Sequence, residues 1–412
     1  MITTVSEFAL GSLNARYLRD EETGAIEWQL LPAGCMPLPE KRRRHADSMI
    51  QAYLTGDELP GGYSGGRTLR NSGTVRALSL QGQRVEQNAD GLCVETRMNH
   101  PKGVFTHRLQ WRTGSAYIIS ETAFTNRSHE PVTLEFLSSF SLGGLSPFAE
   151  GTAPGALWLH RLLSGWSMEG RLRSDMVEIL GLEPSWARFG VRCLRFGQAG
   201  SMPCNGWFPW LMVEDRRAGV FWGCALRHNA SWQIEAYRQD DGLAVSGGLA
   251  DSEFGQWWKT LAPGETFTAP AALLTAVQTS SLDEAAACLA ADDPEHLPVN
   301  LSPICNEYCA TWGSPSQQRV ERLVQAVRGH SFGCFVIDCG WYNAEGVPSI
   351  HIDVTNPDAR AFLWQKLQQN YYRYGIRTFW LDEAEPEYAR YDFDNYRYTL
   401  GTDLEVGNCY PV

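Results

Sequence analysis

The stretch CFVID at residues 334–338 decides how the last third of the chain folds, because an apolar run ends there directly on the acidic residue Asp338. Upstream of it, ICNEYC at residues 304–309 predicts another short strand. Between the two, residues 316–327 repeat apolar side chains at helical spacing. A strand, a helix and a strand in this order are typical of a βαβ unit in a parallel sheet or a (β/α) barrel.

The same alternation continues downstream. Residues 357–372 predict a second helix, with Asn356 as its N-cap, proline at its first position and Gly375 as its C-terminal cap. The apolar run at 376–381 then predicts another strand, which ends at Asp382. Two strands of this part are therefore expected to finish on a carboxylate.

Asp338 and Asp382 are the candidate catalytic residues. Polar groups at the carboxyl ends of parallel strands face the site, although a single Asp there more often starts a turn or caps a helix. Two packed carboxylates repel, and a fold tolerates this mainly where the shifted pKa values serve chemistry. Retaining glycosidases use such a pair, a nucleophile and a general acid/base ~5–5.5 Å apart. The sequence has no GxSxG nucleophile elbow, so serine hydrolysis is poorly supported.

The N-terminal two thirds of the chain read as strands. Residues 117–124 and 132–137 alternate apolar with polar side chains, turn residues separate such runs, and helical windows are scarce. The sequence predicts a multidomain β and α/β protein. Its parts are an antiparallel β-sandwich (supersandwich) over 1–281, a helical linker over 282–299 and an incomplete (β/α)8 TIM-type barrel over 300–412.

Composition narrows the function. A net charge of −12 argues against nucleic acid or an anionic membrane as the main partner. No run approaches the ~18 apolar residues of a membrane helix, and the N-terminus does not resemble a signal peptide.

The 11 cysteines lack a CxxC pair, which predicts reduced thiols and a cytoplasmic protein. Cys305 and Cys309 have neither a second pair nor a histidine cluster nearby, so we predict no metal site and no cofactor. The 15 Trp, 15 Tyr and 17 Phe suit the apolar faces of sugars, although a large β core accounts for most of them.

Several blocks resemble the bacterial α-galactosidases of glycoside hydrolase family 36 over residues 10–345. These blocks are residues 160–172, 195–203, 246–251, 306–313 and 336–342. The resemblance implies a large β-sandwich followed by a (β/α)8 barrel, in which Asp338 binds hydroxyls of the terminal galactose. It also implies substrate-binding roles for Asn306 and Trp341. Cys339 stands where many members have a second Asp, so one hydrogen bond to the sugar is missing or made differently.

The chain after residue 350 is more similar to the α-glycosidases and α-xylosidases of family 31. Residues 353–360 and 379–387 carry this similarity. Those enzymes hold the nucleophile at a Trp-x-Asp strand end, which implies that Asp382 is the nucleophile, with Trp380 and Glu385 as substrate-binding neighbours. Both families retain the anomeric configuration through a covalent glycosyl-aspartate. The resemblance therefore leaves α-galactose, α-glucose and α-xylose open as the sugar.

We expect a retaining α-glycosidase, foremost an α-galactosidase that hydrolyses terminal α-galactosyl residues of oligosaccharides. A (β/α)8 barrel takes ~250 residues. At ~30 residues per βαβ step, the residues after 299 hold three or four strands, and the acid/base is expected to be absent from this chain. The alternative is a catalytically incomplete fragment or a non-enzymatic carbohydrate-binding remnant. Open strand edges of an incomplete barrel predict association into a homo-oligomer.

Overall fold

The structure, a computed structural model, describes most of the chain. The described residues are 1–38, 46–59, 68–165, 167–183, 191–200, 204–239, 242–290, 302–339, 352–379, 397–399 and 401–402. Internal contacts divide the chain into two units, residues 1–290 with 353–412, and residues 291–352. The expected domain boundaries after residues 281 and 299 stay predictions.

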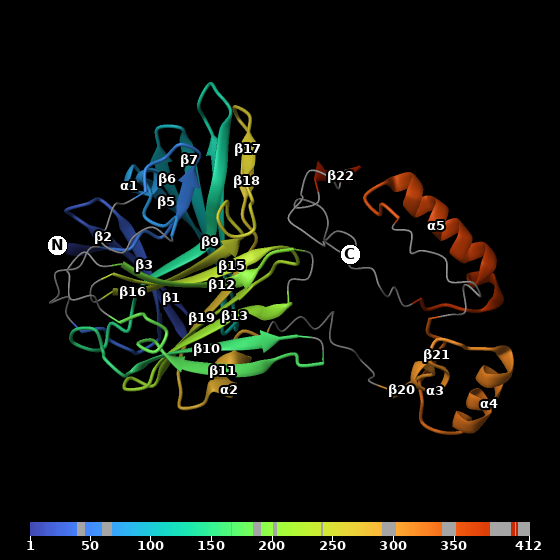
Figure 1. Cartoon of the computed structure of the whole chain (residues 1–412). Helices are drawn as coiled ribbons and strands as arrows, with labels where there is room; N and C mark the ends of the chain where they lie inside the picture. The colour runs from blue at the N-terminus through green and yellow to red at the C-terminus, as the bar shows by residue number, and fades with distance from the viewer. Residues whose placement is uncertain are drawn as a thin grey trace. The chain divides into compact units, whose positions relative to one another are not determined.

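The described part of residues 2–278 forms three antiparallel sheets (Figure 1). A three-stranded sheet contains β1 (Ile2–Leu10), β2 (Leu13–Asp20) and β3 (Ile26–Pro32). A ten-stranded sheet runs in the order β11 (Arg171–Met176), β10 (Leu157–Ser164), β13 (Gly206–Asp215), β14 (Val220–Leu226), β19 (Ala272–Gln278), β8 (Ile118–Asn126), β7 (Gly103–Arg112), β6 (Gly91–His100) and β5 (Ser79–Asn88), with β18 (Thr266–Thr268) paired to β8. A six-stranded sheet runs β12 (Val191–Gln198), β15 (Trp232–Gln239), β16 (Gly242–Leu249), β9 (Val132–Leu145) and β17 (Lys259–Leu261), with β4 (Ala52–Leu54) paired to β9.

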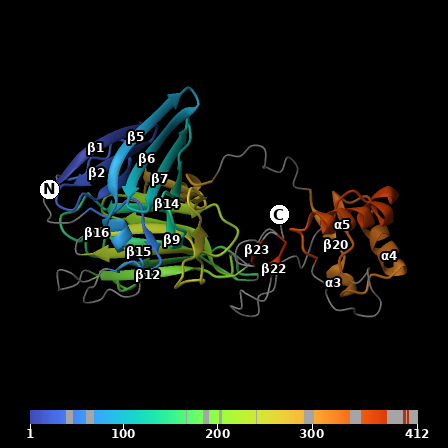
Figure 2. The ribbon, with the colours of Figure 1, turned by 90° about the horizontal axis from the view of Figure 1, so that it is seen from above.

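The local pattern of the sequence explains these strands. Along β8, buried and half-buried side chains alternate without a break, as a strand with one face on the core requires. The first half of β9 alternates in the same way, and its second half is buried on both faces. β5, β6 and β7 lie side by side in both ribbon views (Figure 1 and Figure 2). The predicted antiparallel sandwich is confirmed.

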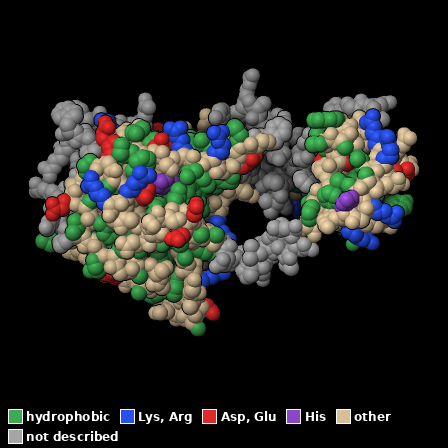
Figure 3. Space-filling view, turned by 90° about the horizontal axis from the view of Figure 1, so that it is seen from below, with side chains coloured by type: hydrophobic (Ala, Val, Ile, Leu, Met, Phe, Trp, Pro, Cys, Tyr) green, Lys and Arg blue, Asp and Glu red, His purple; other side chains and the backbone are tan. Residues whose placement is uncertain are grey.

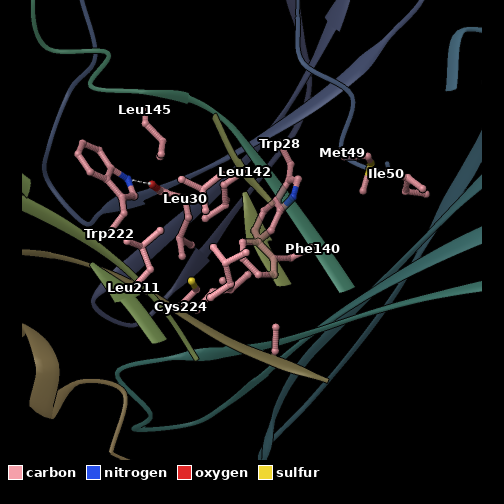
Figure 4. Packing of buried hydrophobic residues seen from close by; sticks show 14 of the residues in the cluster. Trp28, Leu30, Met49, Ile50, Phe140, Leu142, Leu145, Leu211, Trp222 and Cys224 are labelled. Carbon is pink, nitrogen blue, oxygen red and sulfur yellow. Dashed lines mark hydrogen bonds between the residues drawn. The ribbon is translucent and has the colours of Figure 1, made fainter. Parts of the chain in front are cut away.

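One large apolar cluster lies between these sheets (Figure 4). Trp222 of β14 and Phe140 of β9 are almost fully buried in it. The indole Nε1 of Trp222 donates a hydrogen bond of 2.7 Å to the carbonyl oxygen of Leu30 in β3. This bond joins the ten-stranded and three-stranded sheets through the core. Two short helices belong to this part of the chain: α1 (Gly73–Arg76) lies between β4 and β5, and α2 (Leu282–Ala287) follows β19.

The second unit contains the predicted strand–helix–strand alternation. Its elements are β20 (Ile304–Asn306), α3 (Tyr308–Thr311), α4 (Gln317–Val327) and β21 (Cys334–Val336). β20 and β21 are parallel, with Ile304 opposite Cys334 and Asn306 opposite Val336. β20 is shorter than the strand predicted over 304–309, because the backbone turns into α3 at Tyr308. The fold class is therefore confirmed as an antiparallel sandwich followed by (β/α)-type structure.

The segment after residue 352 differs in part from the prediction. α5 (Pro357–Asn370) begins as predicted, with the Asn356 side chain accepting a hydrogen bond from the Asp358 backbone at 2.9 Å. It ends at Asn370, and a 3-10 turn, η1 (Tyr372–Tyr374), follows and is capped by Gly375 with φ 102°.

The predicted strand over 376–381 is not formed in its described part, residues 376–379. No described strand pairs with these residues, and Ile376 is 47% exposed. A parallel strand needs hydrogen-bonded neighbours, which an apolar run alone does not supply. β22 (Arg397–Tyr398) and β23 (Gly401–Thr402) form a short antiparallel pair.

The surface of the sandwich is mixed in charge. On the face that Figure 3 shows, acidic and basic side chains are interspersed with hydrophobic ones. Within the described residues, no helix is both long enough and apolar enough to cross a membrane.

Candidate functional site

The carboxyl ends of β20 and β21 bring two predicted site residues together. Asn306 is the last residue of β20, and Asp338 lies two residues beyond the end of β21. Because the strands are parallel and in register, the two side chains meet, and Asn306 Nδ2 donates to Asp338 Oδ2 at 2.6 Å. The structure thus brings these two side chains together, while their roles in binding a sugar stay predictions.

The geometry of this pair fixes the direction of both side chains. Asp338 Oδ1 accepts a hydrogen bond from the Cys339 backbone N–H at 2.7 Å, while its Oδ2 accepts from Asn306. The Oδ1 of Asn306 accepts from the Tyr308 backbone N–H at 2.9 Å. A carboxylate has about four lone-pair sites, so Asp338, which is half-buried, retains capacity for donors such as sugar hydroxyls.

Glu307 is a residue of this site that the sequence did not reveal. Its side chain is almost completely buried, with a relative exposure of 1%. Its Oε1 accepts a hydrogen bond of 3.0 Å from the Asp338 backbone N–H, and its Oε2 accepts from the Thr311 hydroxyl. A buried carboxylate is tolerated where hydrogen bonds compensate its desolvation. Glu307 therefore ties the end of β20 to the end of β21 and holds the backbone that carries Asp338.

Four other predicted residues lie outside the described residues. These are Trp341, Trp380, Asp382 and Glu385. Their roles as substrate-binding residues and, for Asp382, as nucleophile remain predictions.

The block at 353–360 contains a structural carboxylate instead of a reactive one. Asp353 Oδ2 accepts from the backbone N–H and the hydroxyl of Thr399 at 2.8 and 2.7 Å. Its Oδ1 accepts from the backbone N–H and the hydroxyl of Thr355 at 2.9 and 2.6 Å. Slight burial opposes ionisation, but these four hydrogen bonds outweigh it and lower the pKa of Asp353 to about 2. Asp353 therefore stays ionised and orders the chain ahead of α5.

The blocks at 195–203 and 246–251 contribute charged side chains to a cluster within the sandwich. Arg195 lies 3.6 Å from a carboxylate oxygen of Glu235 and 3.4 Å from one of Asp251. Burial raises the pKa of both carboxyls, although the Arg195 guanidinium opposes this. With relative exposures of 4% and 1%, Glu235 and Asp251 are closed off from solvent, so we assign them a structural role.

Among the described residues, no group of three or more His, Cys, Asp or Glu side chains is arranged to hold a metal ion.

Comparisons with known proteins point to glycoside hydrolases. Residues 307–412 match the family model described as the TIM-barrel domain of glycosyl hydrolases family 31. The fold of the chain is similar to that of solved α-galactosidases, several of them titled as members of family 36. Sequence similarity over the last quarter of the chain is thus to family 31, while the fold is similar to that of family 36 enzymes.

Particular relatives show how far this similarity reaches. The α-galactosidase from Lactobacillus brevis superimposes with a TM-score of 0.61 at 15% identity, over 82% of this chain and 48% of that one. The family 36 α-galactosidase AgaA from Geobacillus stearothermophilus, solved with raffinose, gives 0.60 at 13% identity, over 82% and 50%. An uncharacterized family 31 glucosidase, ORF2 of Pseudescherichia vulneris, is 64% identical over 59 residues, which are 14% of this chain and 11% of that protein. α-Xylosidase A of Aspergillus niger is 39% identical over 75 residues, covering 14% and 10%. The chain thus spans about half the length of each of these two solved enzymes. Its matches to the two sequence relatives span about a tenth of their length.

Proposed function

We propose that the chain is the sandwich and part of the barrel of a retaining α-glycosidase. The observation that carries this proposal is the Asn306–Asp338 pair, held at 2.6 Å at the carboxyl ends of two parallel strands. Active sites of (β/α) barrels lie at this end of the strands. Further support comes from the family 31 match, which begins at residue 307 and includes Asp338.

In this proposal Asp338 and Asn306 bind the terminal sugar. The carboxylate of Asp338 accepts hydrogen bonds from ring hydroxyls, and hydrogen bonds to a charged acceptor are the stronger kind. Its orientation is set before the sugar arrives, because Asn306, the Cys339 backbone and Glu307 already hold it. Binding energy is therefore not used to order the side chain. Trp341, Trp380 and Glu385 complete the proposed binding residues.

The proposed nucleophile is Asp382. Its carboxylate attacks the anomeric carbon, the bond to the leaving oxygen breaks, and a covalent glycosyl-aspartate forms. Water then attacks that carbon, the ester bond to Asp382 breaks, and the sugar leaves with its original configuration. We assign the acid/base to no residue of these 412. A nitrophenolate leaving group needs no proton, so nitrophenyl glycosides test the first step without an acid.

The first proposed substrate class is the terminal α-galactoside of an oligosaccharide. A second candidate, an α-xyloside or α-glucoside, is favoured by a specific observation: the local sequence identity is to a family 31 glucosidase and to an α-xylosidase. Both candidates use the same reaction and differ in the hydroxyls that the site recognises.

The test is nitrophenol release from the α-galactoside, α-glucoside and α-xyloside by wild type and by Asp382→Asn. We expect one of the three substrates to be cleaved and the variant to lose that activity by several orders of magnitude. Asp338→Asn should weaken binding of the same substrate. Asp358→Asn, an exposed carboxylate in the first turn of α5, is the matched control and should behave as wild type. Equal background release by wild type and Asp382→Asn would leave only the carbohydrate-binding remnant.

Three further expectations belong to the proposal. We propose a β-sandwich domain over 1–281, a linker over 282–299 and a barrel domain over 300–412. We also propose a cytoplasmic protein, because the cysteines of the described residues are free thiols, which is the usual state in a reducing compartment. Homo-oligomer formation is tested by light scattering coupled to gel filtration, in which a monomer mass would refute it.

A further inference from the structure

We propose that Tyr308 and Trp312 form an aromatic platform that stacks on the second sugar of an α-linked oligosaccharide, the unit that leaves on cleavage. This inference rests on the proposed α-glycosidase function and adds a binding subsite to it. The platform is built by α3, a single helical turn that starts directly after β20 (Figure 1).

Exposure and backbone conformation both mark Trp312. Its side chain is 75% exposed, and its φ is 51°, in the left-handed region that bulky residues rarely adopt. Strained residues of this kind cluster at functional sites and ligand clamps. Tyr308, 37% exposed, meets Trp312 edge to face, with ring centroids 5.8 Å apart and the planes at 63°. Two large aromatic rings are thus held toward solvent in one fixed arrangement.

The base of the same turn is buried, which makes the platform rigid. Glu307 and Thr311, with relative exposures of 1% and 5%, are hydrogen-bonded to each other beneath it. The Trp312 backbone N–H closes the turn on the Tyr308 carbonyl oxygen at 2.6 Å. A preorganised aromatic surface loses little conformational entropy when a ligand stacks on it. The turn therefore has the construction of a binding surface.

Contacts connect the platform to the polar pair from two sides. On one side the Tyr308 backbone N–H donates to Asn306, which itself donates to Asp338. On the other side Gly313 lies next to Cys339, since a Cβ added at Gly313 would be in ordinary contact with Cys339 Sγ, at 3.4 Å. The aromatic pair thus belongs to the turn that begins directly after Asn306 and Glu307, the two side chains that hold Asp338. In the proposal, a terminal sugar bound at Asp338 leaves its second unit over this neighbouring turn.

The chemistry of the surroundings favours a sugar over an apolar protein segment. Aromatic faces suit the C–H faces of a pyranose, while the neighbouring amide and carboxylate suit its hydroxyls. The exposed apolar residues Ile304 and Phe332 lie at the amino ends of β20 and β21, not beside the platform. Ile337, 46% exposed, precedes Asp338, so the described surroundings of the platform mix apolar and polar side chains, as carbohydrate sites do.

The test compares a single sugar with a longer one by calorimetric titration of the full chain. The affinity for methyl α-galactoside reports on the terminal subsite alone, and the affinity for raffinose reports on the terminal and second subsites together. If the nitrophenol assay selects an α-glucoside or α-xyloside instead, the methyl glycoside and an oligosaccharide of that sugar replace these two ligands. We expect wild type to bind the longer ligand more tightly. Trp312→Ala should lose that advantage, by about 3- to 10-fold, with the affinity for the methyl glycoside unchanged. Trp312→Phe should retain part of it.

The matched control is Trp258→Ala, which removes another exposed tryptophan, 57% exposed, from the sandwich. It should change neither affinity. The inference is overturned if Trp312→Ala keeps the advantage of the longer ligand, or if it weakens both ligands equally, which indicates a structural role. If wild type binds no glycoside of the three sugars, the proposed function fails together with the platform. The two failures are therefore distinguishable.

Discussion

Replacing Glu307 by alanine should release the backbone that carries Asp338. In the native protein this buried carboxylate accepts hydrogen bonds from the Asp338 N–H at 3.0 Å and from the Thr311 hydroxyl. Alanine removes both acceptors at a position with 1% exposure. A buried donor left without a partner costs about 1–3 kcal/mol. The Thr311 hydroxyl can rotate to another acceptor, so only the Asp338 N–H loses its partner and the expected loss of local stability is about 1–3 kcal/mol.

Hydrogen exchange of the Asp338 backbone amide measures this loss directly. Each 1.4 kcal/mol corresponds to a tenfold change, so Glu307→Ala should accelerate exchange of that amide by about 5- to 150-fold. Glu307→Gln keeps an oxygen that can accept from the Asp338 N–H, and its amide can donate to the Thr311 hydroxyl. We expect a smaller acceleration, of about tenfold or less.

Glu321→Ala is the matched control, since Glu321 is an exposed carboxylate of α4 that accepts from Gln317 at 2.8 Å. It should leave exchange at Asp338 unchanged. The reasoning is refuted if Glu307→Ala shows the wild-type exchange rate at Asp338. If the glutamine variant is as severely affected as the alanine variant, then negative charge at Glu307, and not its role as acceptor, holds the site.

Three further predictions concern the sandwich. Trp222→Phe leaves the buried Leu30 carbonyl without its 2.7 Å donor, so urea unfolding should show a loss of about 1–3 kcal/mol, and an unchanged midpoint would contradict this. Arg70→Met leaves the Asp47 carboxylate without the guanidinium that pairs with it, at a cost of about 3–5 kcal/mol, and adding Asp47→Asn should recover part of that loss. Burial lowers the pKa of His107 to about 3, from 6.5 in the unfolded chain. The unfolded chain therefore takes up a proton first as pH falls from 6.5 toward 3, and the free energy of unfolding should decrease by up to about 5 kcal/mol over this range. His107→Gln should flatten that pH dependence.

The elements that the sequence predicted well are those that local pattern determines. β8 alternates along its whole length, and α4 and the start of α5 follow from helical spacing and the Asn356 cap. The predicted strand at 376–381 failed over its described residues, because pairing with neighbours decides a parallel strand and periodicity does not contain that information. Gly375 was correctly identified as a left-handed cap, but it ends a 3-10 turn and not the helix itself.

The site was predictable to the same limited extent. Asp338 stands out because an apolar run ends on it, and the parallel register of β20 and β21 then brings Asn306 to it. Glu307 could not be found this way. Its two donors are 4 and 31 residues away in the sequence, so only the folded chain shows that this carboxylate is buried and satisfied. The only local signal was a carboxylate four residues before a threonine, at helical spacing.

Among the described residues, accessibility separates Asp338 from the two buried carboxylates beside Arg195. Glu235 and Asp251 lie near one guanidinium, that of Arg195, and by composition alone they resemble a catalytic pair. They are nearly inaccessible to solvent, and a glycosidic bond cannot reach a carboxylate enclosed in a sandwich. Asp338 is half-buried, held by a neutral amide and a backbone N–H, and lies where strands of a (β/α) unit end. These differences support the proposal that Asp338 binds a sugar and the structural role assigned to Glu235 and Asp251.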